Sequence, residues 1–328
     1  MWRAEKEDWP IADEFRIARG AKRVAEVVVV SFIRDGVTGR GECVPYPRYG
    51  ESAAAVIAAV NDITDDVADS QRLSAQLPAG ALRNGMDCAL LDWRAQVERT
   101  TAWQLLGLPQ PQAVTTAFTI GIAAPDVMHA RAKENADRPV LKVKLGGPDA
   151  ADDAERLRGV REGAPASQII VDANEGWQVS QLEQMLPVAV QCDVALIEQP
   201  LPVAEDAALV ALQSPVSIGA DESVHTEADL DALRDKYDVV NIKLDKTGGL
   251  TQACHTIQRA QALGFEIMIG CMVATSLSMA PALLLAPQAK FVDLDGPLLL
   301  QRDREPGLVY DNSTIRWPKQ RLWGEPGR

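Results

Sequence analysis

The chain has 328 residues, with 33 Lys and Arg against 46 Asp and Glu, which gives a formal net charge of -13. This acidity excludes nucleic acid and anionic membranes as expected partners, because both bind basic surfaces. The length suits an α/β barrel joined to a smaller domain.

The first residues, MWRAEKEDWP, lack the apolar run of a signal peptide, and no stretch is both long and apolar enough to span a bilayer. The five cysteines are scattered, without a CxxC motif or a cluster of Cys and His. This spacing excludes a disulfide framework and a structural zinc site. We therefore expect a reduced, cytoplasmic protein.

The first third of the chain predicts a small α+β domain. Residues 25–33 are rich in valine, which is typical of a strand, and an Asp-Gly turn leads into a second strand at 39–44. Residues 51–69 and 80–98 are Ala-rich, with apolar positions three and four residues apart. That spacing predicts a helix in each segment.

The rest of the chain repeats one theme. After the proline-rich stretch LPQPQAV, apolar runs recur about every 25 residues, separated by Ala-rich segments with helical periodicity. Eight such strands fit a (β/α)8-type barrel. A doubly wound open sheet is the alternative, but no GxGxxG motif follows an early strand. The runs lie at 117–122, 140–145, 169–174, 195–200, 216–221, 239–244, 266–271 and 291–296.

These patterns divide the chain into two domains. We assign residues 1–112 to the α+β domain and residues 113–298 to the barrel. After the eighth strand, residues 299–328 contain many Pro, Arg and Trp and are too few for another complete unit. We expect this last segment to fold back and complete the N-terminal domain.

Acidic residues end three successive predicted strands. Asp172, Glu198 and Asp221 each follow a short apolar run. Active sites of barrels lie at the C-terminal ends of the strands, so neighbouring strands bring these carboxylates within reach of one ion. Oxygen ligands without cysteine or histidine favour a hard cation, Mg²⁺ before Mn²⁺. The alternative is that each acid caps the following helix or pairs with a lysine.

Lysines flank the acidic residues on either side. Lys142 and Lys144 share one face of the second strand, where mutual repulsion and partial burial lower a lysine pKa. Lys243 lies on the sixth strand, so a circular barrel places Lys144 and Lys243 on opposite sides of the ion. This arrangement suits two bases that face one carbon atom. Lys246 competes for the second position, but its parity is opposite to that of Lys243; alternatively, all of these lysines only neutralise the acids.

Other polar residues lie near the same strand ends. Asp293 and Asp295 share one face of the last strand and would attract a cation such as a substrate ammonium, unless they are only helix caps. Asn174 and Gln199 are expected to support the ligands as hydrogen-bond donors. Three histidines and one tryptophan are interpreted as surface or packing residues rather than catalysts. They are His129, His225, His255 and Trp177.

The motifs together resemble the enolase superfamily, in its muconate-lactonizing branch. The matching stretches are KVK at 142–144, VDAN at 171–174, IEQP at 197–200, ADES at 220–223 and NIK at 241–243. The resemblance covers nearly the whole chain and implies an α+β capping domain followed by a (β/α)7β barrel. It also implies a single Mg²⁺ in each subunit, with Lys144 and Lys243 as an acid/base pair, a use of lysine that is general in this superfamily. The implied ligands are Asp172, Glu198 and Asp221.

Within that branch, the DLD at 293–295 and the stretch at 41–52 look like dipeptide epimerases of the L-Ala-D/L-Glu type, which act in murein peptide metabolism. This likeness implies that the aspartates bind the ammonium of the dipeptide and that Lys142 keeps Lys144 poised. One lysine would remove the α-proton of the C-terminal residue to give an enediolate, and the other would return a proton to the opposite face. Loop residues Arg48 and Tyr49 would close the site and contact the side chain, and Arg19 could bind an acidic side chain.

Several alternatives stay open. Ala274 stands where some dipeptide epimerases carry a glutamate, which leaves the preferred dipeptide undetermined. N-acylamino-acid racemase and o-succinylbenzoate synthase use the same scaffold without a substrate ammonium. A Schiff-base aldolase needs no divalent ion, and a barrel retained only for binding needs no chemistry. Relatives of this kind form dimers or octamers, so a homo-oligomer is open as well.

Overall fold

The computed structural model describes residues 1–63 and 69–327. Its N-terminal part is an antiparallel sheet in the order β1-β2-β3, formed by β1 (Trp2–Ile17), β2 (Gly20–Arg34) and β3 (Val37–Cys43). Both predicted strands are confirmed, and β2 is longer than expected. Strand β1 was missed because its sequence is rich in charged residues, which carry no strand signal. It gains its conformation from pairing with β2 along nearly its whole length.

Helices cover one face of this sheet. Val28, Val30 and Phe32 alternate along β2 and pack against α1 (Ala53–Asp62) and α3 (Ala81–Val97). Helix α3 lies so close to β3 that a Cβ on Gly41 would stand 2.2 Å from the carbonyl oxygen of Gly85. The helix predicted at 80–98 is confirmed, because α3 spans nearly the same residues.

The predicted helix at 51–69 is shorter than expected. Helix α1 ends at Asp62, and residues 64–68 lie outside the described residues. A separate helix, α2 (Ser70–Gln76), begins after Asp69, whose carboxylate accepts the backbone N–H of Arg72 as an N-cap.

The barrel consists of eight parallel strands in the order β12-β11-β10-β9-β8-β7-β6-β5. Each predicted apolar run contains one of these strands, so the barrel prediction is confirmed. The two ends of the sheet meet where the backbone N–H of Ala117 donates to the carbonyl of Val292 at 2.8 Å. The strands are β5 (Phe118–Ile120), β6 (Val140–Lys144), β7 (Gln168–Asp172), β8 (Val194–Glu198), β9 (Ile218–Ala220), β10 (Val239–Ile242), β11 (Glu266–Gly270) and β12 (Phe291–Asp293).

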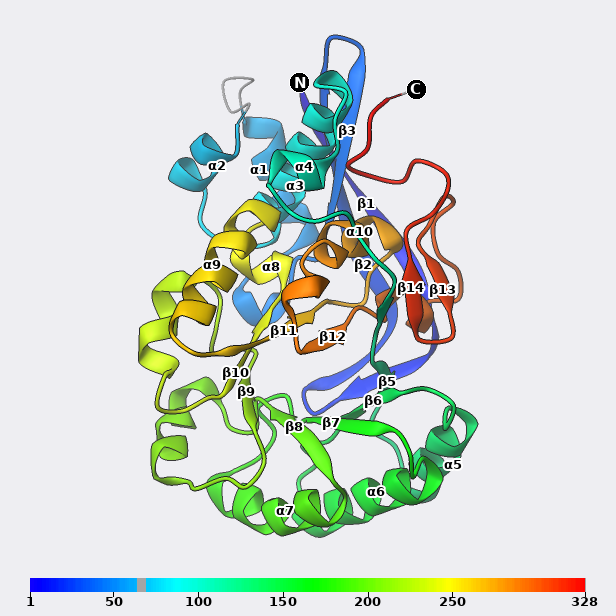
Figure 1. Cartoon of the computed structure of the whole chain (residues 1–328), viewed down its shortest axis with the longest axis vertical. Coiled ribbons are helices and arrows are strands. Elements are labelled where there is room, and N and C mark those ends of the chain that lie inside the picture. The colour runs from blue at the N-terminus through cyan, green and yellow to red at the C-terminus, as the bar shows by residue number, and fades with distance from the viewer. Residues whose placement is uncertain (64–68, 328) are drawn as a thin grey trace.

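Helical segments follow the barrel strands and cover their outer side (Figure 1). Five of the connections contain α-helices, whereas those after β8 and β9 contain only 3-10 helices, η2 (Val203–Ala211) and η3 (Glu227–Leu233). The α-helices are α5 (Pro125–Glu134), α6 (Ala150–Gly163), α7 (Val179–Gln191), α8 (Leu244–Thr247), α9 (Leu250–Ala262) and α10 (Ser276–Leu283). The last unit ends in the short η5 (Gly296–Leu299).

The C-terminal segment returns toward the start of the chain, and both termini lie at the same end of the molecule (Figure 1). The indole N–H of Trp323 donates to the carbonyl of Cys88 in α3 at 3.1 Å, and Arg321 pairs with Asp92 at 2.5 Å. Strands β13 (Val309–Asp311) and β14 (Thr314–Arg316) form a small sheet with β4 (Val114–Thr115). On these contacts we propose the division 1–112 with 299–328, and 113–298.

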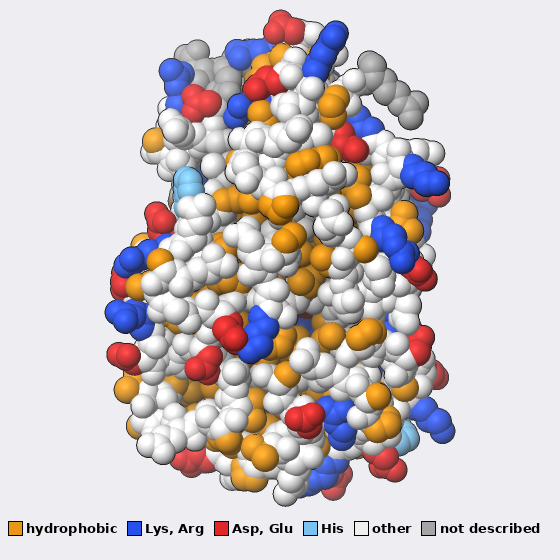
Figure 2. Space-filling model, viewed as in Figure 1, with side chains coloured by type: hydrophobic (Ala, Val, Ile, Leu, Met, Phe, Trp, Pro, Cys, Tyr) orange, Lys and Arg blue, Asp and Glu red, His pale blue; other side chains and the backbone are white. Residues whose placement is uncertain are grey.

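The surface bears charges of both signs. On the face that Figure 2 shows, Asp and Glu side chains are interspersed with Lys and Arg, without a continuous basic area. Among the described residues, no helix is long and apolar enough to cross a membrane.

Candidate active site

The acidic residues predicted from the sequence lie together at the C-terminal ends of the strands. Asp172 on β7 is the direct neighbour of Glu198 on β8, and Lys144 on β6 is the direct neighbour of Asp172. Asp221 follows the last residue of β9. Each of the three carboxyl side chains is at most 2% exposed. Parallel pairing with the predicted parity thus places the three acids and Lys144 in one buried layer.

Lysine ammonium groups connect these acids. Lys142 Nζ lies 2.8 Å from Asp293, 2.7 Å from Glu198 Oε2 and 3.1 Å from Asp172. Lys144 donates to Asp172 at 2.6 Å. The pairing of acids with lysines, one of the alternatives weighed from the sequence, is therefore present in this structure.

The charges shift the pKa values of the acids in different directions. Burial together with the charge of Asp172 raises the pKa of Glu198 to about 7. Burial would also raise the pKa of Asp172, but the ammonium groups of Lys144 and Lys142 outweigh burial and lower it. Lys243 and Lys246 lower the pKa of Asp221 well below its usual range in the same way. Asp172 and Asp221 are thus held as carboxylates.

The lysine pKa values correct one expectation. Burial favours the neutral form of Lys142, but the charges of Asp293, Glu198 and Asp172 raise its pKa well above its ordinary value. The pKa of Lys243 is raised as well, because Asp221 outweighs burial and the repulsion by Lys142. Repulsion between lysines, which was expected to lower a lysine pKa together with burial, is weaker here than attraction to buried carboxylates.

The three acids offer oxygen ligands, which are the type that a hard cation prefers. Asp172, Glu198 and Asp221 offer buried carboxylate oxygens from adjacent strands, and Oε2 of Glu198 lacks a hydrogen bond of good geometry even though Lys142 is near. The described residues contain no group of three His, Cys, Asp or Glu side chains already arranged around a metal position. The lysine pairs described above hold the carboxylates instead.

The structure separates the two candidates for the second base. Lys243 lines the cavity and contacts Asp221 at 2.6 Å. Lys246 does not line it: its ammonium donates to the carbonyl and carboxylate of Asp221 at 2.5 and 2.6 Å and to the carbonyl of Asn241 at 3.0 Å. All three of its protons are therefore engaged, which favours Lys243 as the group that faces a substrate.

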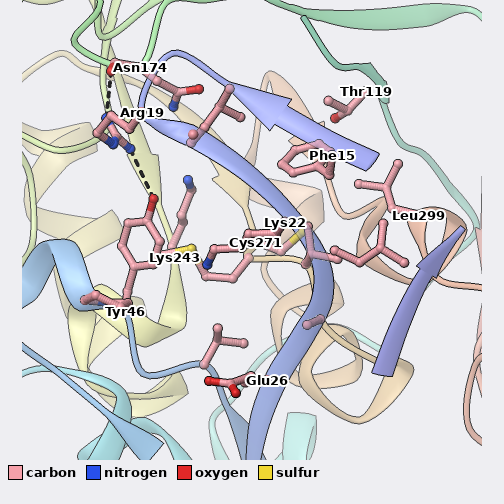
Figure 3. Close-up of a pocket in the computed structure, with 18 of the residues that line it drawn as sticks. Phe15, Arg19, Lys22, Glu26, Tyr46, Thr119, Asn174, Lys243, Cys271 and Leu299 are labelled. Carbon is pink, nitrogen blue, oxygen red and sulfur yellow. Dashed lines mark hydrogen bonds between the residues drawn. The ribbon is translucent and has the colours of Figure 1, made fainter. Parts of the chain in front are cut away.

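A cavity of about 620 Å³ lies between the N-terminal sheet and the mouth of the barrel. Lys142, Lys144 and Lys243 line it, as do Asp293 and Asp295. Figure 3 shows Arg19, Tyr46 and Asn174 grouped at one end of this cavity and Phe15, Thr119 and Leu299 at the other. Lys243 and Cys271 lie between the two groups.

The aspartates at the end of β12, Asp293 in the strand and Asp295 two residues later, differ in their partners. Asp293 pairs with Lys142, and its second oxygen, Oδ1, is buried without a hydrogen-bond partner among the described residues. Asp295 accepts the backbone N–H of Thr119 at 2.7 Å. Burial and the charge of Asp293 raise the pKa of Asp295 to about 7. An added cation at this place would stabilise both carboxylates.

The residues expected to contact a substrate side chain lie in different surroundings. Tyr49 lines the cavity, as predicted, and its ring packs edge-on against His225 at 4.5 Å. Arg48 is absent from the cavity lining and binds Glu175 at 2.8 Å. Arg19 lines the cavity, but its guanidinium is already paired with Glu222 at 2.6 Å and with Glu175 at 3.1 Å.

Supporting residues are only partly those expected. Gln199 does not touch a candidate ligand carboxylate; its side-chain carbonyl accepts the backbone N–H of Asp221 at 2.9 Å. Asn174 contacts Asp172 through its backbone N–H at 2.9 Å. The amide of Asn241, which no prediction named as a supporting residue, donates to Glu198 at 2.7 Å. Its parity with Lys243 was the signal that could have identified it.

The remaining sequence interpretations concern residues outside the cavity lining. Trp177 is buried and donates to Asp153 at 2.8 Å, so its interpretation as a packing residue is confirmed. His129 contacts the carbonyl of Gly159 on the outer helices. His225 is half-buried beside Tyr49 rather than on the surface, and burial and Lys246 lower its pKa.

Comparison with known protein families agrees with this arrangement. Residues 3–107 match the N-terminal domain of mandelate racemase and muconate lactonizing enzyme, and residues 127–320 match the enolase C-terminal domain-like family. Both parts of the structure therefore have counterparts in the same family.

Similar proteins span nearly the whole chain. An L-Ala-D/L-Glu epimerase of Escherichia coli (strain K12) is 44% identical over 94% of this chain and 97% of its own length. An N-acetyl-D-glutamate racemase of a Pseudoalteromonas species is 42% identical over 91% and 95%.

Solved structures are similar over the same extent. An enolase family member from Agrobacterium tumefaciens with bound sodium and L-Ala-L-Glu has a TM-score of 0.95 and 49% identity, covering 98% of this chain and 99% of its own. A dipeptide epimerase from Cytophaga hutchinsonii, complexed with Mg and D-Ala-L-Val, has a TM-score of 0.87 and 27% identity over 97% and 92%. The chain therefore belongs to the enolase superfamily, in the group of mandelate racemase and muconate lactonizing enzyme.

Proposed function

We propose that the protein is an isomerase that epimerises a dipeptide at its C-terminal residue, of the type L-Ala-L-Glu to L-Ala-D-Glu. One observation carries this proposal: Lys144 on β6 and Lys243 at the end of β10 line the same cavity, with the acid-bearing strands β7, β8 and β9 between them. Two amines on opposite sides of a layer of carboxylates suit the transfer of a proton from one face of a carbon atom to the other. Relatives named as dipeptide epimerases support the same reaction.

A divalent cation belongs to this proposal. Asp172, Glu198 and Asp221 would hold a single Mg²⁺ in each subunit, or Mn²⁺, and similar structures are complexed with Mg. When bound, such an ion supplies positive charge that holds the substrate carboxylate and stabilises the negative charge that develops at its α-carbon.

The two lysines would carry the proton. One of them, in its neutral form, takes the α-proton, and the ammonium of the other returns a proton to the opposite face. Asp221 at present stabilises the charged form of Lys243. A cation bound by this carboxylate would weaken its stabilisation of the ammonium, and the pKa of Lys243 would then fall toward the range that a base requires. Lys142 remains charged among three carboxylates and positions them.

The cavity offers counter-charges for both ends of a dipeptide. Asp293 and Asp295 would bind its ammonium, since Asp293 has an unpartnered buried oxygen. For an acidic side chain, Lys22 is the better candidate than Arg19. Lys22 lines the cavity, contacts the ring of Tyr46 at 4.9 Å and has no carboxylate partner within ion-pair distance among the described residues.

A second candidate is racemisation of an N-acylglutamate. It is favoured by the N-acetyl-D-glutamate racemase that is 42% identical to this chain. Such a substrate has no ammonium, so it would leave Asp293 and Asp295 with only Lys142 and Thr119 as partners. The dipeptide accounts for both aspartates and is therefore preferred.

The test is incubation with Mg²⁺ in D₂O. We expect deuterium to enter the α-position of the C-terminal residue of L-Ala-L-Glu while the L,D form accumulates, as measured by mass spectrometry and proton NMR. Asp295→Asn should impair turnover of the dipeptide and leave turnover of N-acetylglutamate unchanged. Exchange with neither substrate would contradict the proposal, and exchange with N-acetylglutamate alone would favour the second candidate.

A further inference from the structure

Two arginines of the N-terminal domain bind two glutamates at the rim of the barrel. Arg48 makes two hydrogen bonds to Glu175, at 2.8 and 2.9 Å. Arg19 reaches the same Glu175 at 3.1 Å and Glu222 at 2.6 Å. We call these four residues, Arg19, Arg48, Glu175 and Glu222, the clasp.

The glutamates of the clasp are enclosed, and its arginines are partly exposed. The side chain of Glu222 is 1% exposed and that of Glu175 is 8% exposed, whereas those of Arg19 and Arg48 are 25% and 40% exposed. Charge-assisted hydrogen bonds to enclosed carboxylates are less screened by water than ordinary surface ion pairs. Their loss should therefore be measurable, unlike the loss of most surface pairs.

The glutamates of the clasp adjoin the candidate ligands in the chain. Glu222 directly follows Asp221, and Glu175 comes three residues after Asp172. Asn174 and Glu175 both have left-handed backbone conformations, with φ of 46° and 64°. Arg19 also donates to the carbonyl of Asn174 at 2.7 Å, so it holds this turn by its backbone as well.

The hairpin that carries Arg19 contacts the barrel directly. The carbonyl of Arg16 accepts the backbone N–H of Ile122 at 3.0 Å. A Cβ added to Gly146, two residues after Lys144, would stand 2.9 Å from the Cβ of Ala18 and 2.3 Å from the carbonyl of Ala173. The tip of the hairpin therefore packs on the turns that follow β5 and β6.

We propose that Arg19 and Arg48 are positioning residues: through Glu175 and Glu222 they hold the N-terminal domain closed over the cavity and fix the chain directly after Asp172 and Asp221. The role in closure is independent of the reaction, while the consequence for turnover rests on the proposed function. Arg19 thus binds two barrel glutamates, and Lys22 is the candidate for an acidic side chain of the substrate.

The direct test is hydrogen exchange of the substrate-free protein, followed by mass spectrometry. Arg48→Ala should speed exchange of the segments 14–23 and 46–51 about tenfold, and exchange of strands β10 and β11 should stay unchanged. Because Arg48 and Glu175 act as a pair, adding Arg48→Ala to Glu175→Ala should have little further effect on the loop 46–51. Arg48→Lys should recover part of the protection.

A matched control comes from the surface of the barrel. Arg259 and Asp231 form an ion pair at 3.0 Å with side chains 45% and 64% exposed, and Arg259→Ala should leave exchange of the hairpin unchanged. The proposal would be overturned if Arg48→Ala exchanged the segments 14–23 and 46–51 at the wild-type rate. It would also be overturned if the effects of Arg48→Ala and Glu175→Ala on the loop 46–51 were additive. The test uses variants of Arg48, which is 40% exposed, and so does not depend on whether a variant of the less exposed Arg19 folds.

Activity provides a second readout. With L-Ala-L-Glu, Arg48→Ala should raise KM about tenfold and change kcat less, because a loosened domain weakens binding before it alters the lysines. A protein inactive on every substrate would refute the proposed function and leave the exchange test intact. Normal exchange combined with a raised KM would refute the clasp and point to direct contact between Arg48 and the substrate.

Discussion

The interior of the barrel is apolar near one end and charged near the other, and along β7, β8 and β12 the two layers are only two residues apart. Near the start of the strands, the inward side chains form an apolar cluster of Ile170, Leu196, Val239, Met268 and Phe291. Two residues further on, the same faces of β7, β8 and β12 carry Asp172, Glu198 and Asp293. Alternation along a strand keeps both sets on one face.

This difference shows how one sheet serves two purposes. The apolar layer contributes burial and close packing, which stabilise the barrel. The charged layer buries ions that are costly to desolvate and persists because lysines and carboxylates lie within hydrogen-bond distance. Substitutions in the two layers should therefore have separable effects on stability and activity.

The largest expected effect is on activity in the charged layer. Lys144→Ala or Lys243→Ala should lower epimerisation of L-Ala-L-Glu by about 10³-fold or more, because each removes one of the two proposed proton-transfer groups. Proton NMR of the dipeptide measures this. Lys290→Ala, which removes a surface lysine paired with Glu266, is the control and should leave the rate unchanged.

Lys142 should affect stability as well as activity. Lys142→Met leaves Asp293, Glu198 and Asp172 without a shared counter-charge and should cost about 3–5 kcal/mol of unfolding free energy. Urea denaturation followed by circular dichroism measures the change. A variant as stable as the wild type would show that these acids take up protons at little cost.

The apolar layer should show the opposite separation. Leu196→Ala is expected to lower the unfolding free energy by about 2–5 kcal/mol, because it leaves a cavity in the packed interior. Per folded molecule, epimerisation should stay close to the wild-type rate. A loss of activity as large as that of Lys243→Ala would mean that the two layers are not independent.

The smallest effect concerns pH and the contact between the domains. Asp245 accepts the backbone N–H of Val44 and the amide of Asn84, and burial raises its pKa to about 7. A folded state that binds a proton more tightly than the unfolded chain loses stability as pH rises from about 4 to 7. We expect a contribution of about 1–3 kcal/mol over this window. Asp245→Asn should flatten the slope of unfolding free energy against pH, and an unchanged slope would assign it to other groups.

The charged layer could be predicted from the sequence because it follows from local order. Strand alternation gives the direction of Asp172, Glu198 and Lys144, and barrel geometry gives their common end. The same reasoning identified all eight barrel strands. It also favoured Lys243 over Lys246, whose three protons prove to be engaged by Asp221 and Asn241.

The N-terminal domain and its contacts could not be predicted in the same way. Strand β1 carries charged residues and depends on β2 for its conformation. Arg19 and Glu222 are 203 residues apart in sequence, and neither side chain has a local signal that names its partner. The sequence offered an acidic side chain of the substrate as a partner of Arg19 and gave no sign of the barrel glutamates that it contacts in this structure.

The central claim is that two lysines act on opposite faces of one carbon atom. The direct measurement is deuterium exchange of L-Ala-L-Glu and L-Ala-D-Glu in D₂O with Lys144→Ala and Lys243→Ala, compared with the wild type. We predict that each variant fails to interconvert the epimers, yet exchanges the α-proton of one of them, and that the exchanged epimer differs between the two variants. Exchange of the same epimer by both variants, or interconversion by either, would contradict the account.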